Sequence, residues 1–171
     1  ICKLLYESMI AFEKAVEIIK NTSYCLDVES VDLHSCLGLV LATDIYSDMD
    51  MPPFNKSAVD GYACRREDLF QDLQLLEVIP AGAIPRHNIG QQQCSKIMTG
   101  AMLPEGADMV FMVEDSYEKS DHTIKFTGIN SASNYTSKGE DIRKGDKVLQ
   151  KGIRLRPQEI AILASVGAAQ P

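Results

Sequence analysis

A serine, an aspartate and a glycine lie close together in the stretch Met51–Ala63, which reads MPPFNKSAVDGYA. Ser57 and Asp60 are three residues apart, and Gly61 has no side chain to crowd the neighbouring carboxylate. A carboxylate beside a glycine suits a ligand that approaches closely or a proton that is transferred. The same residue types also form ordinary turns, in which Ser and Asp side chains bond to nearby backbone amides. Residue types alone favour such a turn.

A glycine loop follows in the stretch Ile97–Val110, which reads IMTGAMLPEGADMV. Thr99 offers a hydroxyl and Gly100 offers a backbone N–H, and groups of this kind bind anions without a lysine. The loop lacks the Gly-Lys-Ser/Thr that ends a P-loop. The pattern is therefore compatible with an oxyanion site and with a purely structural loop between two strands.

Acidic and basic side chains alternate between two glycines in a third stretch, Lys138–Asp146, which reads KGEDIRKGD. Such turns are mostly solvated, and each exposed ion pair contributes only about 0–1 kcal/mol. Composition permits a functional role for Asp141 but does not require one.

The overall composition excludes several classes of protein. The 171 residues carry a net charge of −7, which leaves no surplus of cations to neutralise phosphates, so we expect no nucleic-acid partner. No apolar run approaches the ~20 residues of a membrane span, so we expect no membrane partner. The five cysteines are odd in number and form no C-x-x-C pair, which predicts free thiols and a cytoplasmic protein without a metal site. Cys64 is interpreted as a small buried residue rather than a nucleophile.

Helical patterns occupy the first part of the chain. A helix is predicted over Ser8–Lys20, where Ser8 can cap it and apolar residues recur at helical spacing. A short helix is predicted over Asp32–Leu37, with Gly38 just past its end. A strand is predicted over Leu39–Tyr46.

The middle of the chain alternates short apolar runs with Gly, Pro and Asn, which is typical of strands. The predicted strands are Leu75–Ile79, Lys96–Met98, Met109–Val113 and Thr123–Phe126. A turn is predicted at Ser120-Asp121. A final helix is predicted from about Leu155, with Pro157 in its first turn and Gly167 at its end.

These elements predict a mainly β fold with flanking helices, of the α+β class. Residues 49–135 are expected to form a β-rich domain inserted into a discontinuous linker domain that comprises residues 1–48 and 136–171.

Five motifs follow one another over nearly the whole chain. They are GLVLA at 38–42, PPF with SAVDGYA at 52–63, TGA with GAD at 99–108, GEDI at 139–142 and LASVG at 163–167. Together, and in this order, they closely resemble the N-terminal half of the molybdopterin molybdenumtransferases, the MoeA family that includes the gephyrin E domain. SAVDGYA is similar to that family's SAMDGYA, with Val59 in place of the usual methionine.

The resemblance implies an enzyme of molybdenum cofactor biosynthesis. Members of the family insert molybdate into adenylylated molybdopterin and release AMP in a Mg²⁺-dependent step, and their subunits form elongated homodimers. The matched half supplies the linker domain and the inserted β domain. The pterin-binding and C-terminal domains would lie further along the chain, so we expect this sequence to be a fragment that is inactive alone.

The resemblance also implies roles for individual residues. Asp60 and Thr99 match the family's functional aspartate and threonine and are the candidate catalytic residues. The candidate substrate-binding residues are Ser57, Gly61, Tyr62, Gly100 and Asp141. Asp141 can instead serve the dimer or the domain junction. The acidic charge of the chain places the main cationic contacts to an anionic substrate outside it.

One position departs from the family pattern. Thr136 stands where the family usually has an arginine two residues after an asparagine, here Asn134. An anion contact by that arginine is therefore absent, and Lys138 is the candidate that compensates.

Two other functions stay open on the sequence. The first is a non-catalytic scaffold or partner-binding module, because gephyrin-like proteins use the same architecture as an interaction platform. The second is a plain β-rich domain whose glycine loops are structural.

Overall fold

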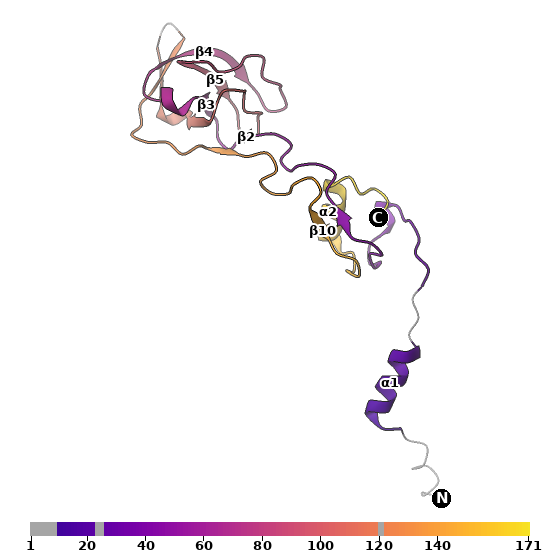
Figure 1. The fold of residues 1–171 in the computed structure, drawn as a ribbon. Coiled ribbons are helices and arrows are strands. Elements are labelled where there is room, and N and C mark those ends of the chain that lie inside the picture. Colours follow the sequence, from indigo (N-terminus) through magenta and orange to yellow (C-terminus); the bar gives the residue numbers. More distant parts are fainter. Residues whose placement is uncertain (1–9, 23–25, 120–121) are drawn as a thin grey trace, which may run out of the picture. The chain divides into compact units, whose positions relative to one another are not determined.

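The computed structural model describes residues 10–22, 26–119 and 122–171 (Figure 1). The chain divides into two compact units, Ile1–Val31 and Asp32–Pro171. Within the described residues, no helix is long and apolar enough to cross a membrane.

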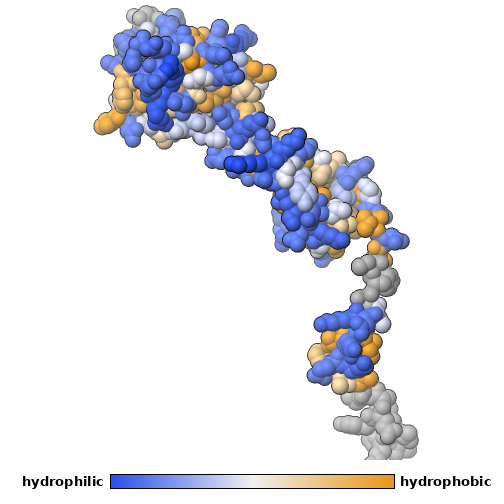
Figure 2. Space-filling model, in the orientation of Figure 1, coloured by the Kyte–Doolittle hydropathy of each residue, from blue (hydrophilic) through white to orange (hydrophobic). Residues whose placement is uncertain are grey.

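The first unit contains helix α1, which spans Phe12–Thr22. Its first turn carries Glu13 and its last turn Lys20, and these charges suit the positive and negative ends of the helix dipole. The helix predicted over Ser8–Lys20 is confirmed from Phe12 to Lys20 and continues to Thr22, whereas Ile10 and Ala11 are not helical and Ser8 lies outside the described residues. No α1 residue is buried, and Figure 2 shows apolar side chains at the surface of this helix.

The second unit begins with one turn of 3₁₀ helix, η1, at Leu33–Ser35. The helix predicted over Asp32–Leu37 is therefore shorter and tighter than expected. The Asp32 carboxylate accepts a hydrogen bond from the His34 amide at 2.9 Å, which caps a turn too short to propagate as an α-helix. Gly38 follows with a φ of 85°, as its position predicted.

The strand predicted over Leu39–Tyr46 is wrong for most of its length. Strand β1 comprises only Ile45–Tyr46 and pairs with β10, Lys147–Leu149. The segment that follows β10 turns at Gly152, where φ is 89°, and this turn interrupts the ladder between the two segments. Beyond this turn the two segments stay side by side through an isolated bridge between Val40 and Arg154 and the backbone hydrogen bonds around it, but they form no further regular strand.

The main structure of the second unit is a six-stranded sheet in the order β6-β3-β5-β4-β8-β7. The strands are β3 Gly61–Cys64, β4 Asp72–Ile79, β5 Gln93–Ile97, β6 Met109–Met112, β7 Ser116–Glu118 and β8 Thr123–Phe126. The β4–β5 pair is parallel and the other pairs are antiparallel. Two short 3₁₀ turns accompany them, η2 at Arg66–Asp68 and η3 at Val113–Asp115.

All four predicted strands are present in this sheet. The strand predicted at Thr123–Phe126 has the observed ends, whereas β4 begins three residues earlier than predicted, β5 is shifted toward the N-terminus and β6 ends one residue earlier. The predicted turn at Ser120-Asp121 lies outside the described residues. The sequence did not predict β3 or β7.

Both faces of the sheet are covered by apolar side chains. Along β3, Tyr62 and Cys64 belong to one buried cluster with Phe111, and the intervening Ala63 belongs to a second cluster with Ile97. Successive side chains of a strand point to opposite faces, so the two clusters lie on opposite sides of β3. Strand β3 is therefore packed on both of its faces.

The chain reaches the sheet and leaves it through two stretches that run antiparallel. Strand β2, Lys56–Ser57, pairs with β9, Tyr135–Thr136, and Met51 forms a bridge with Ile142. Figure 1 shows β2 beside the six-stranded sheet, where the chain enters it.

The last helix of the second unit is α2, Pro157–Ser165. Pro157 occupies its first turn, and the Glu159 carboxylate accepts a hydrogen bond from the Arg156 amide at 3.0 Å, which caps the helix start. Gly167 follows the helix with a φ of 76°. The predicted C-terminal helix is confirmed.

Candidate functional site

Asp60 lies in the turn that connects β2 to β3. Its side chain is exposed, and its backbone carbonyl accepts a hydrogen bond from the Val113 amide at 3.1 Å. Asp60 is followed directly by Gly61, the first residue of β3. The carboxylate is therefore presented at the start of a buried interior strand.

Thr99 meets Asp60 because of the strand register. In the antiparallel β3–β5 pair, Gly61 lies opposite Ile97. The residue that precedes β3 and the residues that follow β5 consequently emerge at the same end of the sheet. The Thr99 amide and the Thr99 hydroxyl both donate to Asp60 Oδ1, each at 2.7 Å. The two candidate catalytic residues form one structural pair.

This pair holds Asp60 in its ionised form. The hydrogen bond from the Thr99 amide, followed by that from the Thr99 hydroxyl, lowers the pKa of Asp60 against a smaller opposing effect of burial. Within the described residues, no protein group hydrogen-bonds to Oδ2 of Asp60. The site therefore presents a fixed carboxylate oxygen to a ligand, metal-bound water or proton.

The donors of the glycine loop are already used inside the protein. The Gly100 amide donates to the Ser57 carbonyl at 2.8 Å, and the Thr99 amide and hydroxyl donate to Asp60. None of these three donors is directed at an external oxyanion. The loop instead positions the carboxylate of Asp60, a function that loop composition did not reveal.

Ser57 is buried and supports the turn. Its hydroxyl donates to the Val59 carbonyl at 2.6 Å, a local bond of the kind that the residue types favoured. Its side chain therefore faces the protein interior, although it is only three residues from Asp60.

Gly61 and Tyr62 also contribute by packing. A Cβ added to Gly61 would lie 2.0 Å from the Phe111 carbonyl oxygen, so the absence of a side chain allows β6 to approach β3. Tyr62 is 2% exposed and stacks on Phe111 with 5.4 Å between ring centroids. Both residues hold the strand on which Asp60 depends.

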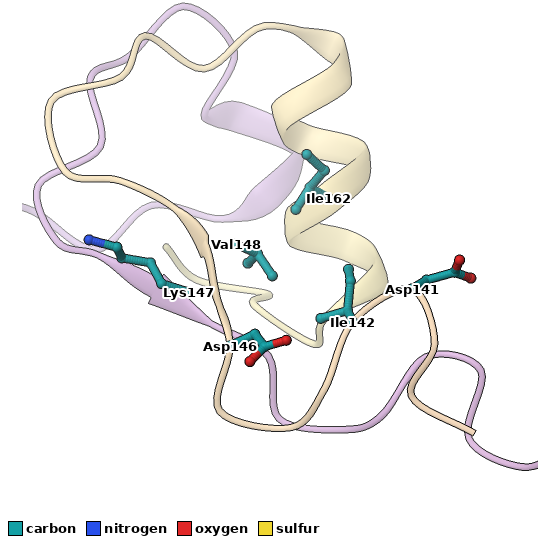
Figure 3. A pocket seen from close by; sticks show the side chains of 6 residues that line it. All are labelled: Asp141, Ile142, Asp146, Lys147, Val148 and Ile162. Carbon is teal, nitrogen blue, oxygen red and sulfur yellow. The ribbon is translucent and has the colours of Figure 1, made fainter. Parts of the chain in front are cut away.

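The structure does not bring Asp141 to this pair. The Asp141 amide donates to the Met51 carbonyl at 3.0 Å, and no hydrogen bond or ion pair within the described residues joins its side chain to Asp60 or Thr99. Asp141 lies at an open pocket of about 270 Å³ whose other lining residues are Ile142, Asp146, Lys147, Val148 and Ile162. Figure 3 shows its carboxylate pointing away from the apolar side chains that gather there.

Lys138, the candidate for replacing the family's arginine, already has a partner. Its ammonium nitrogen lies 3.5 Å from Asp50 Oδ2. Thr136, at the position of that arginine, pairs instead with Lys56 across the β2–β9 ladder. The sequence did not indicate that Lys56 lies beside Thr136, because neither β2 nor β9 was predicted and only the pairing of these two strands brings the residues together.

The site offers limited means of holding a metal ion. No group of three or more His, Cys, Asp or Glu side chains suited to a metal is present among the described residues. Asp60 can supply one carboxylate oxygen, which suits Mg²⁺ when the ion is bound mainly by substrate phosphates and water. Among the described residues, the site therefore fits Mg²⁺ only with Asp60 as one ligand of the ion and does not provide a complete set of protein ligands.

The buried β3, the Asp60–Thr99 pair at its end and the two antiparallel connecting stretches define a chain of the MoeA type. The chain belongs to the family described as the MoeA N-terminal region (domains I and II), which matches residues 10–167.

Curated relatives and a solved structure agree with this assignment. The molybdopterin molybdenumtransferase of Staphylococcus epidermidis is 34% identical over 165 residues, which cover 92% of this chain and 39% of the relative. That of Haemophilus influenzae is 36% identical over 157 residues, which cover 90% and 39%. The crystal structure of the molybdopterin biosynthesis MoeA protein from Pyrococcus horikoshii OT3 matches with a TM-score of 0.84 at 34% identity, covering 95% of this chain and 45% of that one.

The chain thus spans about two-fifths of the length of these two curated relatives, 39% in each case. The expected resemblance and the mainly β fold with flanking helices are both confirmed.

Proposed function

We propose that this chain is part of a molybdenum-insertion enzyme of molybdenum cofactor biosynthesis. The enzyme transfers molybdenum from molybdate to adenylylated molybdopterin and releases AMP. The observation that carries this proposal is the Asp60–Thr99 pair, with both hydrogen bonds at 2.7 Å, in a chain of the MoeA N-terminal family. The names of the relatives supply the reaction class.

Asp60 is the residue proposed to act at the phosphoanhydride of the substrate. Its Oδ2 accepts a proton from, or orients, a water molecule at the phosphorus that is attacked, while Thr99 fixes the carboxylate through Oδ1. Bound Mg²⁺ would neutralise charge on the phosphoanhydride.

An acidic chain cannot be the main binding surface for an anionic substrate. The net charge of −7 therefore assigns most cationic contacts to the remainder of the parent protein. In this proposal the parent protein is a cytoplasmic homodimer, and the Asp60 site of one subunit is completed by the pterin-binding domain of its partner. The 171-residue chain is inactive alone.

Complementation tests the proposal directly. The full-length parent protein is expressed in a strain that lacks its own molybdenum-insertion enzyme, and activity of a molybdenum-dependent reductase is measured. Full-length protein is expected to restore that activity, and residues 1–171 alone are not. In vitro, AMP release should depend on molybdate. Failure of the full-length protein to complement, together with no AMP release, would overturn the proposal.

A further inference from the structure

The exposed surface beside Asp60 has a regular alternation. Ser57 of β2 is buried, whereas Lys56 on one side of it is half-buried and Ala58 on the other side is exposed. Two residues beyond Ala58 the exposed carboxylate of Asp60 follows. Lys56, Ala58 and Asp60 thus lie in order along one exposed face.

The segment after Thr99 continues this face. The Ser57 amide donates to the Ala101 carbonyl at 2.9 Å, and Lys56 forms an antiparallel bridge with Met102. This pairing places Gly100 beside Ala58. Ala101 is fully buried, whereas Gly100 is exposed like Ala58, and Met102 is half-buried like Lys56.

Between Lys56 and the Asp60–Thr99 pair the surface is almost bare. Ala58 carries a single methyl group, and Gly100 carries none. A Cβ added to Gly100 would have no atom within 4 Å, so the space above it is open. We call Ala58 and Gly100 the bare strip.

Lys56 differs in its charge environment from two other lysines of the second unit, Lys138 and Lys147. Lys138 and Lys147 lie 3.5 and 3.3 Å from the carboxylates of Asp50 and Asp44. Lys56 has no acidic partner within the described residues. Its neighbour in the β2–β9 ladder, Thr136, and its neighbour in the isolated bridge, Met102, are both uncharged. Its ammonium is available for an anion.

We propose that Lys56 is a substrate-binding residue of the Asp60 site and binds a phosphate group of a ligand that lies across the bare strip. This inference rests on the proposed function, which supplies a substrate with a phosphoanhydride. It assigns the anionic phosphate to Lys56 and leaves Asp60 Oδ2 for the reacting end. A charged residue on each side of a bare strip also gives the ligand a direction.

A binding experiment on the full-length protein tests this assignment. The probe is ADP-ribose, a diphosphate that carries an organic group on each side, and its dissociation constant is measured by calorimetry. Lys56→Met is expected to weaken binding by about tenfold, as the loss of a charge-assisted hydrogen bond predicts. Lys56→Arg should stay close to wild type. Lys125→Met, which removes an exposed lysine from β8, is the matched control and should bind normally.

A second variant tests the bare strip without changing charge. Ala58→Gln introduces a longer side chain at an exposed position, so the protein should keep its melting temperature and lose affinity for ADP-ribose. Equal affinities of wild type and Lys56→Met, an equal loss in Lys125→Met, or no binding by wild type would each overturn the assignment.

The result is separable from that of the proposed function. Complementation by a full-length protein whose ADP-ribose binding is independent of Lys56 overturns the phosphate assignment alone. Lys56-dependent binding in a protein that neither complements nor releases AMP overturns the proposed function and supports the anion site.

Discussion

Thr99 donates two hydrogen bonds, one from its amide and one from its hydroxyl, to the same carboxylate oxygen of Asp60, which is 39 positions away in sequence. The antiparallel pairing of β3 with β5 brings the two residues to one end of the sheet. Both donors converge on Oδ1, which leaves Oδ2 without a hydrogen bond from the described residues. The geometry of the site is therefore a property of the sheet register.

Asp60→Asn in the full-length protein should fold normally and lose molybdenum insertion by about a hundredfold or more, the usual range for removing a general acid or base. The amide oxygen of asparagine can still accept from Thr99, which preserves the turn. AMP release measures the loss, and circular dichroism verifies the fold. Wild-type activity in a folded Asp60→Asn protein would contradict the role given to Asp60.

Thr99→Val tests how the hydroxyl supports Asp60. The pKa of Asp60 is lowered in the folded protein, so its ionised form stabilises the fold above the ordinary value of 3.8, and this stabilisation is lost as the pH falls through the lowered value. The variant keeps the amide donor and loses the hydroxyl donor. Urea unfolding should show a stability gap from wild type that is constant near neutral pH and shrinks below pH 3.8.

Thr99→Ser is the control for this titration, because it retains the hydroxyl. Its stability should follow the wild-type pH dependence. A stability gap in Thr99→Val that does not change with pH would show that lost packing, and not the bond to Asp60, causes the effect.

Gly61→Ala should destabilise the chain by about 3 kcal/mol or more, because the new Cβ would lie 2.0 Å from the Phe111 carbonyl oxygen and force β3 and β6 apart. Gly82→Ala is the comparison. Gly82 has a φ of 82° and nothing within 4 Å of an added Cβ, so only the left-handed backbone is penalised, by about 1–2 kcal/mol. Denaturant unfolding of both variants measures the difference, and a larger loss in Gly82→Ala would refute the steric explanation.

Cys64 and Cys94 lie opposite each other in the β3–β5 pair, and both are fully buried. Burial raises the pKa of each thiol to about 12. At pH 8 the thiolate is then about one part in ten thousand, so neither residue should react with iodoacetamide in the folded protein. Mass spectrometry of peptides labelled with and without urea checks this. Rapid labelling of Cys64 in the folded protein would show that β3 opens readily.

Strands were predictable from the sequence where the two faces of the sheet differ. In Thr123–Phe126, buried and more exposed residues alternate, and the predicted strand has the observed ends. In Gly61–Cys64 all four residues are buried, so no alternation marks β3. The glycine that disfavours a strand on propensity is required there by the close approach of Phe111. Tertiary packing, which local sequence does not contain, determined this strand.

The same limit applies to the site. The motif order predicted that Asp60 and Thr99 belong to one site, but the contact between them depends on the β3–β5 register. Residue types suggested that the Gly100 amide could serve an anion, whereas the fold directs it to the Ser57 carbonyl. No motif assigned a role to Lys56. Its position relative to the site became apparent only from its pairing with Thr136 and its bridge with Met102.

The antiparallel stretches that connect the sheet to the rest of the second unit also affect how this fold can change. The pairs Lys56–Thr136 and Met51–Ile142 close a loop of about 80 residues at its base, and the entropy of such a closure grows only with the logarithm of loop length. Residues can therefore be added to or removed from surface turns between these pairs at small cost, while the ends of the segment stay together. Surface turns of the sheet can vary in length among relatives while the base that carries Lys56 keeps its register.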